Sequence, residues 1–277
     1  MGRARELPLK NILITGAAGR IGSVLRRGLR RSDRTLHLLD IADLGERADG
    51  EVLIQGDATD FDFAKQAMQH INTVVHLAAY PLEAGWATIF PLNYQLTYNV
   101  FEAARLANVR RLIFASSIQA VGFHALEHRI DDTTRLRPSG FYGVSKGFGE
   151  CLASLYADKF GLSVACLRIA SFEERPLDER MLATWLSHED GVHLFDRCID
   201  ADDFHFIRVY GVSNNDRAKV DNTHVDWLGY QPKSNAEEYV DEVLSHGRPL
   251  GLLARITHGG DPTDMDFTGS VKDVLSN

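Results

Sequence analysis

The chain has 277 residues, of which 44% are hydrophobic and 25% charged, and its formal net charge is −8 at pH 7. This length can bury a full hydrophobic core, either as one large domain or as a domain with an appendage. The negative charge argues against nucleic acid or an anionic membrane as the main partner, because both attract clustered Lys and Arg.

Short apolar segments of β type alternate with segments of helical period over the first 170 residues. Buried-looking strands separated by helices indicate parallel crossovers and a sheet covered on both faces. The expected fold class is therefore α/β, with a doubly wound parallel sheet. In chain order we expect strands at 11–15, 35–43, 51–60, 72–80, 110–117 and 162–170, and helices after the first strand and at 61–71, 93–109 and 140–161.

After residue 171 the alternation is weaker. We expect a loop and then a helix over 171–199, a late strand at 204–212 and a short acidic helix at 235–247. The last stretch, 259–277, is rich in Gly, Asp and Ser and is expected to be a surface tail or an oligomer arm.

The lack of targeting segments and the number of cysteines predict a cytoplasmic protein. The sequence contains no run of about 18 apolar residues, so no membrane span is expected. The first ten residues lack the apolar segment of a secretory signal. The cysteines, Cys151, Cys166 and Cys198, are odd in number, which favours reduced thiols. Neither they nor the histidines show ligand spacing, so we expect no metal site.

The segment TGAAGRIG places Gly16, Gly19 and Gly22 between the first strand and the first helix. The first glycine permits a tight turn, the second lets the backbone approach a pyrophosphate, and the third lets the helix pack close to the strand. The helix N-terminus then faces the phosphate charge. Because the motif follows an apolar strand and opens an amphipathic helix, it predicts a dinucleotide site, to which we also assign Arg20 and Ile21.

Acidic and small residues at the ends of the next strands extend the expected cofactor site. Asp40 ends the second strand, where it would accept hydrogen bonds from a ribose 2′-hydroxyl and repel a 2′-phosphate, which favours NAD over NADP. A helix N-cap is the alternative role for Asp40. Asp57 is expected to reach the adenine, and an Asx-turn is its alternative. The other expected cofactor contacts are Ala58, Leu77, Ala78, Ala79, Asn93, Tyr142, Lys146 and Ile169.

The segment FYGVSKGFGE places Tyr142 and Lys146 four residues apart at the start of an expected helix, so that they share a face. A phenol with a pKa near 10 is a poor base at pH 7. An ammonium within about 4–6 Å stabilises the phenolate and lowers that pKa. Ser117 ends the fifth strand, at the edge of the sheet where ligands collect. The three residues are the predicted catalytic group, with Tyr142 as base and Ser117 bound to the reacting oxygen.

These motifs carry a family resemblance. TGAAGRIG, HLAA, ASS, YGVSK and the helix with Asn93 resemble the extended short-chain dehydrogenases/reductases, over residues 9–170. The resemblance implies an NAD-binding Rossmann core at 9–170, and a small substrate lobe with a C-terminal tail at 171–277 that partly completes the sheet. It also implies that Asn93 helps organise the proton network, with a helix-capping amide as the alternative, and that two long helices pair in a homo-oligomer.

A narrower resemblance covers much of the remainder. FASS, YGVSKGFGE and RIASFEERPLDERMLATWLSHED resemble the uronate dehydrogenases, which oxidise C1 of galacturonate or glucuronate to the aldarolactone with NAD. The match implies that Ser171 and Arg180 contact substrate, with Arg180 holding the sugar carboxylate through two parallel hydrogen bonds. A surface pair with a neighbouring acid is the alternative for Arg180.

The chain departs from that family beside the catalytic serine. Ile118 and Gln119 stand where uronate dehydrogenases have Asn-His, and Tyr80-Pro81 stands where they have a substrate-side serine. Gln119 remains a candidate to donate to a sugar hydroxyl, whereas Ile118 is not. The open alternatives are C1 oxidation of a neutral aldose or of a sugar phosphate held by Arg180 and Arg175, a nucleotide-sugar epimerase or dehydratase, and an NAD-binding sensor without turnover.

Overall fold

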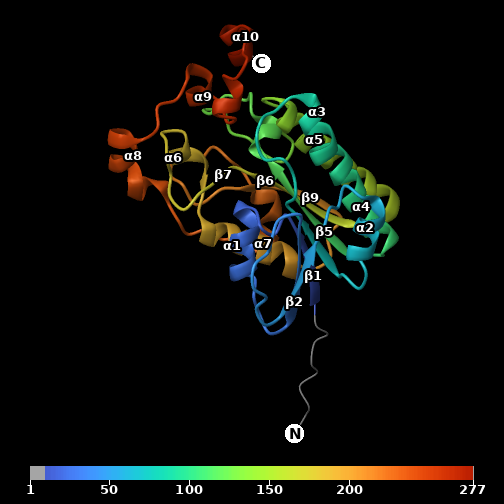
Figure 1. The fold of residues 1–277 in the computed structure, drawn as a ribbon. Coiled ribbons are helices and arrows are strands. Elements are labelled where there is room, and N and C mark those ends of the chain that lie inside the picture. Colours follow the sequence, from blue (N-terminus) through green and yellow to red (C-terminus); the bar gives the residue numbers. More distant parts are fainter. Residues whose placement is uncertain (1–9, 277) are drawn as a thin grey trace.

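A seven-stranded, entirely parallel sheet forms the centre of the computed structural model, which describes residues 10–276 (Figure 1). The strand order is β3-β2-β1-β4-β5-β6-β9. Residues 1–9 and 277 lie outside the described part. Two expectations fall there: Leu9 as the first residue of the NAD-binding core, and the lack of a secretory signal in the first ten residues, nine of which are not described. The strands are β1 (Lys10–Thr15), β2 (Arg34–Asp40), β3 (Glu51–Gln55), β4 (Thr73–His76), β5 (Arg111–Ser117), β6 (Ser163–Ile169) and β9 (Phe206–Gly211).

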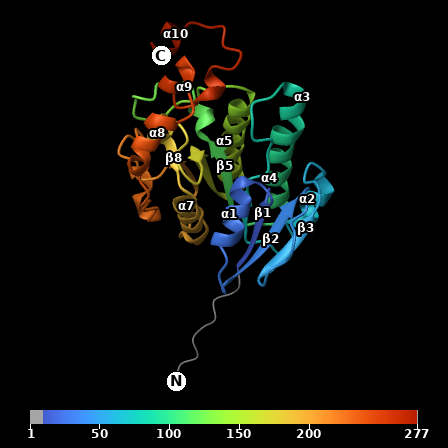
Figure 2. The same cartoon turned by 60° about the vertical axis from the view of Figure 1, so that its left-hand side comes forward.

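Helices cover both faces of the sheet, so the expected doubly wound α/β class is confirmed. Figure 2 shows α1 (Arg20–Gly28) and α7 (His188–Asp200) on one side, and α2 (Phe61–Ala67) and α4 (Leu96–Leu106) on the other, where α5 (Phe141–Phe160) packs against α4. Alternating strand residues fill the two cores. In β1, Ile12 and Ile14 join the cluster that contains α1, while Leu13 joins the cluster that contains α4.

Helical structure begins earlier, and is less regular, than the helix expected at 93–109. A short helix, α3 (Trp86–Ile89), leads into a π-helical stretch, η1 (Phe90–Gln95), before α4 begins. Asn93 therefore lies in the π-helix, a form that is rare and often found at functional sites. The third and fourth strands are also shorter than expected, because 56–60 and 77–80 leave the sheet as loops.

The C-terminal elements gather at the end of the molecule opposite to the start of β1 (Figures 1 and 2). They comprise β7 (Ser171–Phe172), α6 (Met181–Thr184), β8 (Trp185–Leu186), α8 (Val240–His246), α9 (Leu252–Ile256) and α10 (Val271–Leu275), with the 3₁₀ turns η4 (Ala236–Tyr239) and η5 (Asp261–Thr263) between them. The 3₁₀ turn η3 (Thr223–Leu228) lies instead near the start of the strands, where Trp227 packs against Phe204 and Phe204 contacts Arg111 at the start of β5. Among residues 10–276, no helix is long and apolar enough to cross a membrane.

The beginning of the expected surface tail is instead part of the packed structure. Gly259, Gly260 and Thr263 are buried. Gly259 donates its N–H to the Gly122 carbonyl at 2.8 Å, directly after the 3₁₀ turn η2 (Ile118–Val121). Glycines permit this close approach, because a Cβ at Gly259 would lie 3.1 Å from Gly122 Cα. The expectation of a surface tail is therefore wrong for this part.

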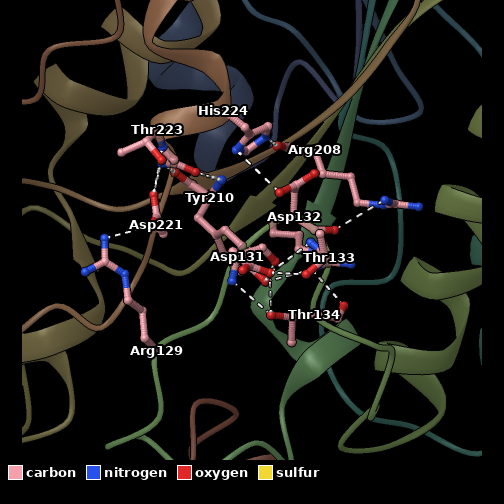
Figure 3. Close-up of polar contacts among 12 residues, drawn as sticks. Arg129, Asp131, Asp132, Thr133, Thr134, Arg208, Tyr210, Asp221, Thr223 and His224 are labelled. Carbon is pink, nitrogen blue, oxygen red and sulfur yellow. Dashed lines mark hydrogen bonds and ion pairs between the residues drawn. The ribbon is translucent and has the colours of Figure 1, made fainter.

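The loop that leads from η2 to α5 is held by a polar network (Figure 3). Asp131 accepts hydrogen bonds from the Thr133 backbone and hydroxyl, at 2.9 and 2.7 Å. Tyr210 on β9 donates its hydroxyl to the Asp131 carbonyl at 2.9 Å. Asp221 accepts a hydrogen bond from Arg129 at 2.8 Å. The segment before α5 is thus fixed to the last strand of the sheet.

Candidate active site

The glycine-rich turn lies between β1 and α1, where the strand order reverses and where ligands collect in folds of this type. Gly16 has φ +73°, and a Cβ there would lie 2.7 Å from the Ala78 nitrogen. A Cβ at Gly22 would lie 2.2 Å from the Gly16 carbonyl oxygen. Within the described residues, no side chain caps the N-terminus of α1. The backbone there is thus available to a phosphate.

The Asp40 carboxylate supports this turn from the end of β2. Its Oδ2 accepts the Ala18 N–H at 2.9 Å, and its Oδ1 accepts the Ala42 N–H at 3.0 Å. Each carboxylate oxygen keeps a further lone pair, which a ribose hydroxyl could use. Asp57 is exposed and accepts the Thr59 N–H at 2.8 Å, so it forms the Asx-turn named as its alternative.

The remaining expected cofactor residues surround the same turn or lie at the strand ends. Arg20 at the start of α1 forms an ion pair with Glu173. Ala78 donates its N–H to the Thr15 hydroxyl at 3.3 Å, which fixes the loop after β4 against β1. Ile21, Leu77 and Ala79 are partly buried, and Ala58 and Ile169 are buried.

The three expected catalytic residues meet at the end of β5. Lys146 is buried, donates its ammonium to the Ala115 carbonyl at 2.9 Å, and lies 5.3 Å from the centre of the Tyr142 ring. Burial lowers the pKa of Lys146 to about 8. Burial also raises the pKa of Tyr142 to about 12, although a hydrogen bond with Ser117 acts in the opposite direction.

The expected lowering of the phenol pKa is therefore wrong for the chain by itself. Desolvation disfavours the charged form of both groups, so it opposes phenolate on Tyr142 and ammonium on Lys146 alike. The ammonium is also bonded to a carbonyl rather than to the phenol oxygen. Additional positive charge near the ring would favour the phenolate.

Asn93 fixes the loop after β4 instead of capping a helix. Its amide oxygen accepts the Tyr80 N–H at 2.8 Å, and its NH₂ group donates to the Tyr80 carbonyl at 3.1 Å and to the Ser145 hydroxyl at 3.1 Å. Both N–H donors of Asn93 are thus used within the chain. Ser145 in turn donates to the Tyr142 carbonyl at 2.7 Å.

Glu83 is a residue at this site that the sequence analysis missed. Its two carboxylate oxygens accept the N–H groups of Phe141 and Tyr142, at 2.7 and 3.1 Å. No local pattern signals this contact, because Glu83 and α5 are far apart in sequence. The missing cap of α5, whose N-cap position is occupied by Gly140, is the only clue.

The substrate-side residues lie at the start of the C-terminal elements. Arg180 is buried, with its Nη2 donating to the Ser171 hydroxyl at 3.0 Å and its Nη1 to the His258 carbonyl at 2.8 Å and to Thr184 Oγ1 at 3.2 Å. Its Nε has no partner. Gly260 lies against the guanidinium, since a Cβ there would be 2.5 Å from Nε.

Arg180 is not the surface ion pair considered as its alternative. Within the described residues it forms no ion pair. The neighbouring acid Asp178 pairs with Arg248 at 2.8 Å, and Glu179 pairs with Arg255 at 3.8 Å. Burial lowers the pKa of Arg180. Asp178 and Asp261 favour its charged form, but neither forms an ion pair with it, so an anionic ligand could still bind the guanidinium directly.

Gln119 contacts the protein itself. Its side-chain N–H donates to the Gly259 carbonyl at 2.6 Å, and its amide oxygen accepts a hydrogen bond from Ser139. It thereby joins η2 to the C-terminal segment. Its role as a donor to substrate stays a prediction.

The comparisons with known proteins identify the family of the chain. The model of the NAD dependent epimerase/dehydratase family matches residues 12–188. The chain belongs to this family. Uronate dehydrogenase of Agrobacterium fabrum (strain C58) is 38% identical over 254 residues, covering 91% of this chain and 96% of that protein. The NAD-dependent glucose-6-phosphate dehydrogenase of Haloferax volcanii is 35% identical over 261 residues, covering 86% and 97%.

A solved structure is similar along nearly the whole chain. It is uronate dehydrogenase from Agrobacterium tumefaciens, in a variant with one tyrosine replaced by alanine and in complex with NAD. The TM-score is 0.88 and the identity 35%, covering 92% of this chain and 97% of that one. The present chain is therefore an NAD-dependent dehydrogenase, with NAD as its cofactor. Across residues 10–276, no group of three or more His, Cys, Asp or Glu side chains is arranged to hold a metal.

The residues present fit the cofactor. Gly16 and Gly22 let the turn pack closely against the loop after β4 and against itself, and the uncapped start of α1 that this turn presents suits a pyrophosphate. When bound, NAD would supply a hydride acceptor and a positively charged ring, and positive charge near Tyr142 would favour its phenolate.

Proposed function

We propose that the protein oxidises the C1 hydroxyl of galacturonate or glucuronate to the aldarolactone. The observation that carries this proposal is Arg180, a buried cation beside Ser171 with no ion-pair partner among the described residues and no partner for its Nε. A sugar carboxylate would supply the missing negative charge and accept two parallel hydrogen bonds from the guanidinium. The similarity to uronate dehydrogenases supports the same assignment.

In the proposed mechanism, Tyr142 removes the proton from the C1 hydroxyl while the hydride on C1 passes to NAD. The C1 carbon of the cyclic sugar thereby becomes the lactone carbonyl. Ser117, which shares a hydrogen bond with Tyr142, also binds the reacting oxygen. Lys146, fixed on the Ala115 carbonyl, keeps its ammonium 5.3 Å from the tyrosine ring centre.

A sugar phosphate is the second candidate, because a relative is named for glucose 6-phosphate. A phosphate dianion calls for more than one cation. Arg175, the second cation considered, is exposed and pairs with Glu242 at 3.4 Å, and the nearby Arg248 is paired with Asp178 and Asp261. A single available guanidinium favours a monoanionic carboxylate.

The test is NADH release at 340 nm from galacturonate, glucuronate, galactose, glucose, arabinose, xylose and glucose 6-phosphate. We expect turnover of the uronates at the highest kcat/KM. A reaction with glucose 6-phosphate alone would support the second candidate, and a reaction with neutral sugars alone would contradict the role of Arg180. An epimerase would convert nucleotide sugars without net NADH.

A further inference from the structure

Glu83 connects the loop after β4 to the first turn of α5, which carries the catalytic pair. The carboxylate accepts the N–H groups of Phe141 at 2.7 Å and of Tyr142 at 3.1 Å. These amides are among the donors that every helix leaves unsatisfied at its start. A carboxylate is well suited to them, because charged acceptors bind N–H groups strongly and oppose the positive end of the helix dipole.

Gly140 provides the space that this contact needs. Its φ of 178° is extended backbone, which any residue adopts, so the conformation does not explain the glycine. Space does: a Cβ at Gly140 would lie 2.2 Å from one carboxylate oxygen of Glu83 and 2.4 Å from its Cδ. Any side chain at position 140 would therefore displace Glu83 from the helix.

The position of Glu83 is itself fixed from a second point. Three residues earlier, both backbone groups of Tyr80 are bound by Asn93, at 2.8 and 3.1 Å. Asn93 also donates to Ser145 at 3.1 Å, on the turn of α5 that lies between Tyr142 and Lys146. The loop 80–83 is thus attached to the first two turns of α5, once through Glu83 and once through Asn93.

We propose that Glu83 is a positioning residue for the catalytic tyrosine, and that Gly140 is a glycine because it admits the Glu83 carboxylate. Tyr142 is the second residue of α5, and helix ends fray unless their backbone groups are held. Glu83 keeps this turn closed, so that the phenol stays at Ser117 while Lys146 stays on the Ala115 carbonyl. The effect on turnover rests on the proposed function, whereas the effect on the helix does not.

The experiment compares Glu83→Ala, Glu83→Gln, Gly140→Ala and the double variant Glu83→Ala/Gly140→Ala. The matched control is Gly85→Ala in the same loop, where a Cβ would meet nothing within 4 Å. Because small displacements of reacting groups are costly, kcat with galacturonate should fall about 10- to 100-fold in Glu83→Ala and in Gly140→Ala, with KM nearly unchanged. Glu83→Gln keeps one accepting oxygen, so its kcat should lie between the kcat of these two variants and that of the wild type.

Two further readouts separate positioning from general stability. If Gly140→Ala acts by displacing Glu83, it should lower kcat by less than about twofold when Glu83 is already Ala. Hydrogen–deuterium exchange of the cofactor-free protein should become faster at residues 141–146 in Glu83→Ala and in Gly140→Ala, and remain unchanged in Gly85→Ala.

The proposal is overturned if Glu83→Ala keeps kcat within about twofold of the wild type, or if Gly140→Ala lowers kcat equally in both backgrounds. Unchanged exchange at 141–146 would overturn it as well. If the wild-type protein does not oxidise uronates, the proposed function fails, and the exchange measurement still decides the role of Glu83.

Discussion

The most direct test of substrate recognition is the replacement of Arg180 by methionine, which removes the charge and keeps a long apolar side chain. A guanidinium has five N–H donors. In the structure, Nη1 uses two on His258 and Thr184, and Nη2 uses one on Ser171. The Nε–H and one Nη2–H are left as adjacent donors, and Gly260 lies against this edge of the guanidinium, so a carboxylate that binds both must displace Gly260.

The expected effect follows from these two donors. Hydrogen bonds to charged groups contribute about 1.5–3 kcal/mol each, so losing both should cost about 3–6 kcal/mol. At about 1.4 kcal/mol per factor of ten, Arg180→Met should lower kcat/KM for galacturonate about 10²–10⁴-fold. Galactose, which has the same ring without the carboxylate, should be affected far less.

The assay is NADH formation from both sugars, with the thermal midpoint as a folding control. The variant loses three internal hydrogen bonds but also an unpaired buried charge, so the two stability effects oppose each other. Arg175→Met, which removes an exposed arginine, should leave kcat/KM within about twofold. An Arg180→Met variant that still prefers galacturonate, or that loses both sugars equally, would refute the carboxylate role.

Four further outcomes test the rest of the site. Tyr142→Phe should lower kcat about 10²–10⁴-fold and leave the Kd for NAD nearly unchanged in a calorimetric titration; normal turnover would exclude the phenol as base. Because burial raises the pKa of Tyr142 to about 12, the phenolate fraction grows with pH across the neutral range, so kcat/KM should rise between about pH 6 and 8, and a flat profile would contradict this base. Asp40→Ala should weaken NAD binding and reduce the discrimination against NADP, since it removes both the acid and the support of Ala18; unchanged affinity for both cofactors would contradict its placement. Glu150→Gln breaks a fully buried pair with Arg168 (2.9 Å) and should reduce the free energy of unfolding in urea by about 3–5 kcal/mol, whereas a loss below about 1 kcal/mol would show that the pair is not stabilising.

Local patterns in the sequence predict the elements that carry the site. The helix expected at 140–161 is α5 (Phe141–Phe160), and the strand expected at 110–117 is β5 (Arg111–Ser117). Both have clear boundaries in the sequence, because apolar periodicity ends there at glycine or at polar residues. The glycine-rich turn is equally local, since its three glycines contact one another or the next strand end.

Contacts between distant segments were not predictable in the same way. Glu83 reaches α5 across 58 residues, and Gln119 reaches Gly259 across 140. The polar, glycine-rich composition of residues 259–277 predicts a surface tail. Composition does not reveal that these glycines allow the backbone to lie against η2 and Arg180.

The pKa of Tyr142 illustrates a different limit. In the sequence, the neighbouring charge of Lys146 at helical spacing predicts a lowered pKa for Tyr142. The shift depends on burial as well, which is set by all segments that pack around the ring, and burial acts against the charged form of both residues. Spacing in the sequence therefore predicts that Tyr142 and Lys146 share a helix face, but it does not predict the pKa of either side chain.

The register between α5 and β5 links the fold to the catalytic geometry. Tyr142, Lys146 and Glu150 lie at intervals of four residues and therefore on one face of α5. They contact consecutive residues of β5: Lys146 binds the Ala115 carbonyl, Glu150 accepts the Ser116 hydroxyl at 2.7 Å, and Tyr142 shares a hydrogen bond with Ser117.

A slide of α5 along its axis would break these three contacts together. Glu150 resists such a slide most, because its carboxylate also binds Arg168 on β6 through two hydrogen bonds of 2.9 Å. The buried ion pair thus holds the helix at its third turn, and Glu83 holds it at its first. The position of the phenol beside Ser117 is consequently set from both sides, by one carboxylate at the helix start and another inside the core.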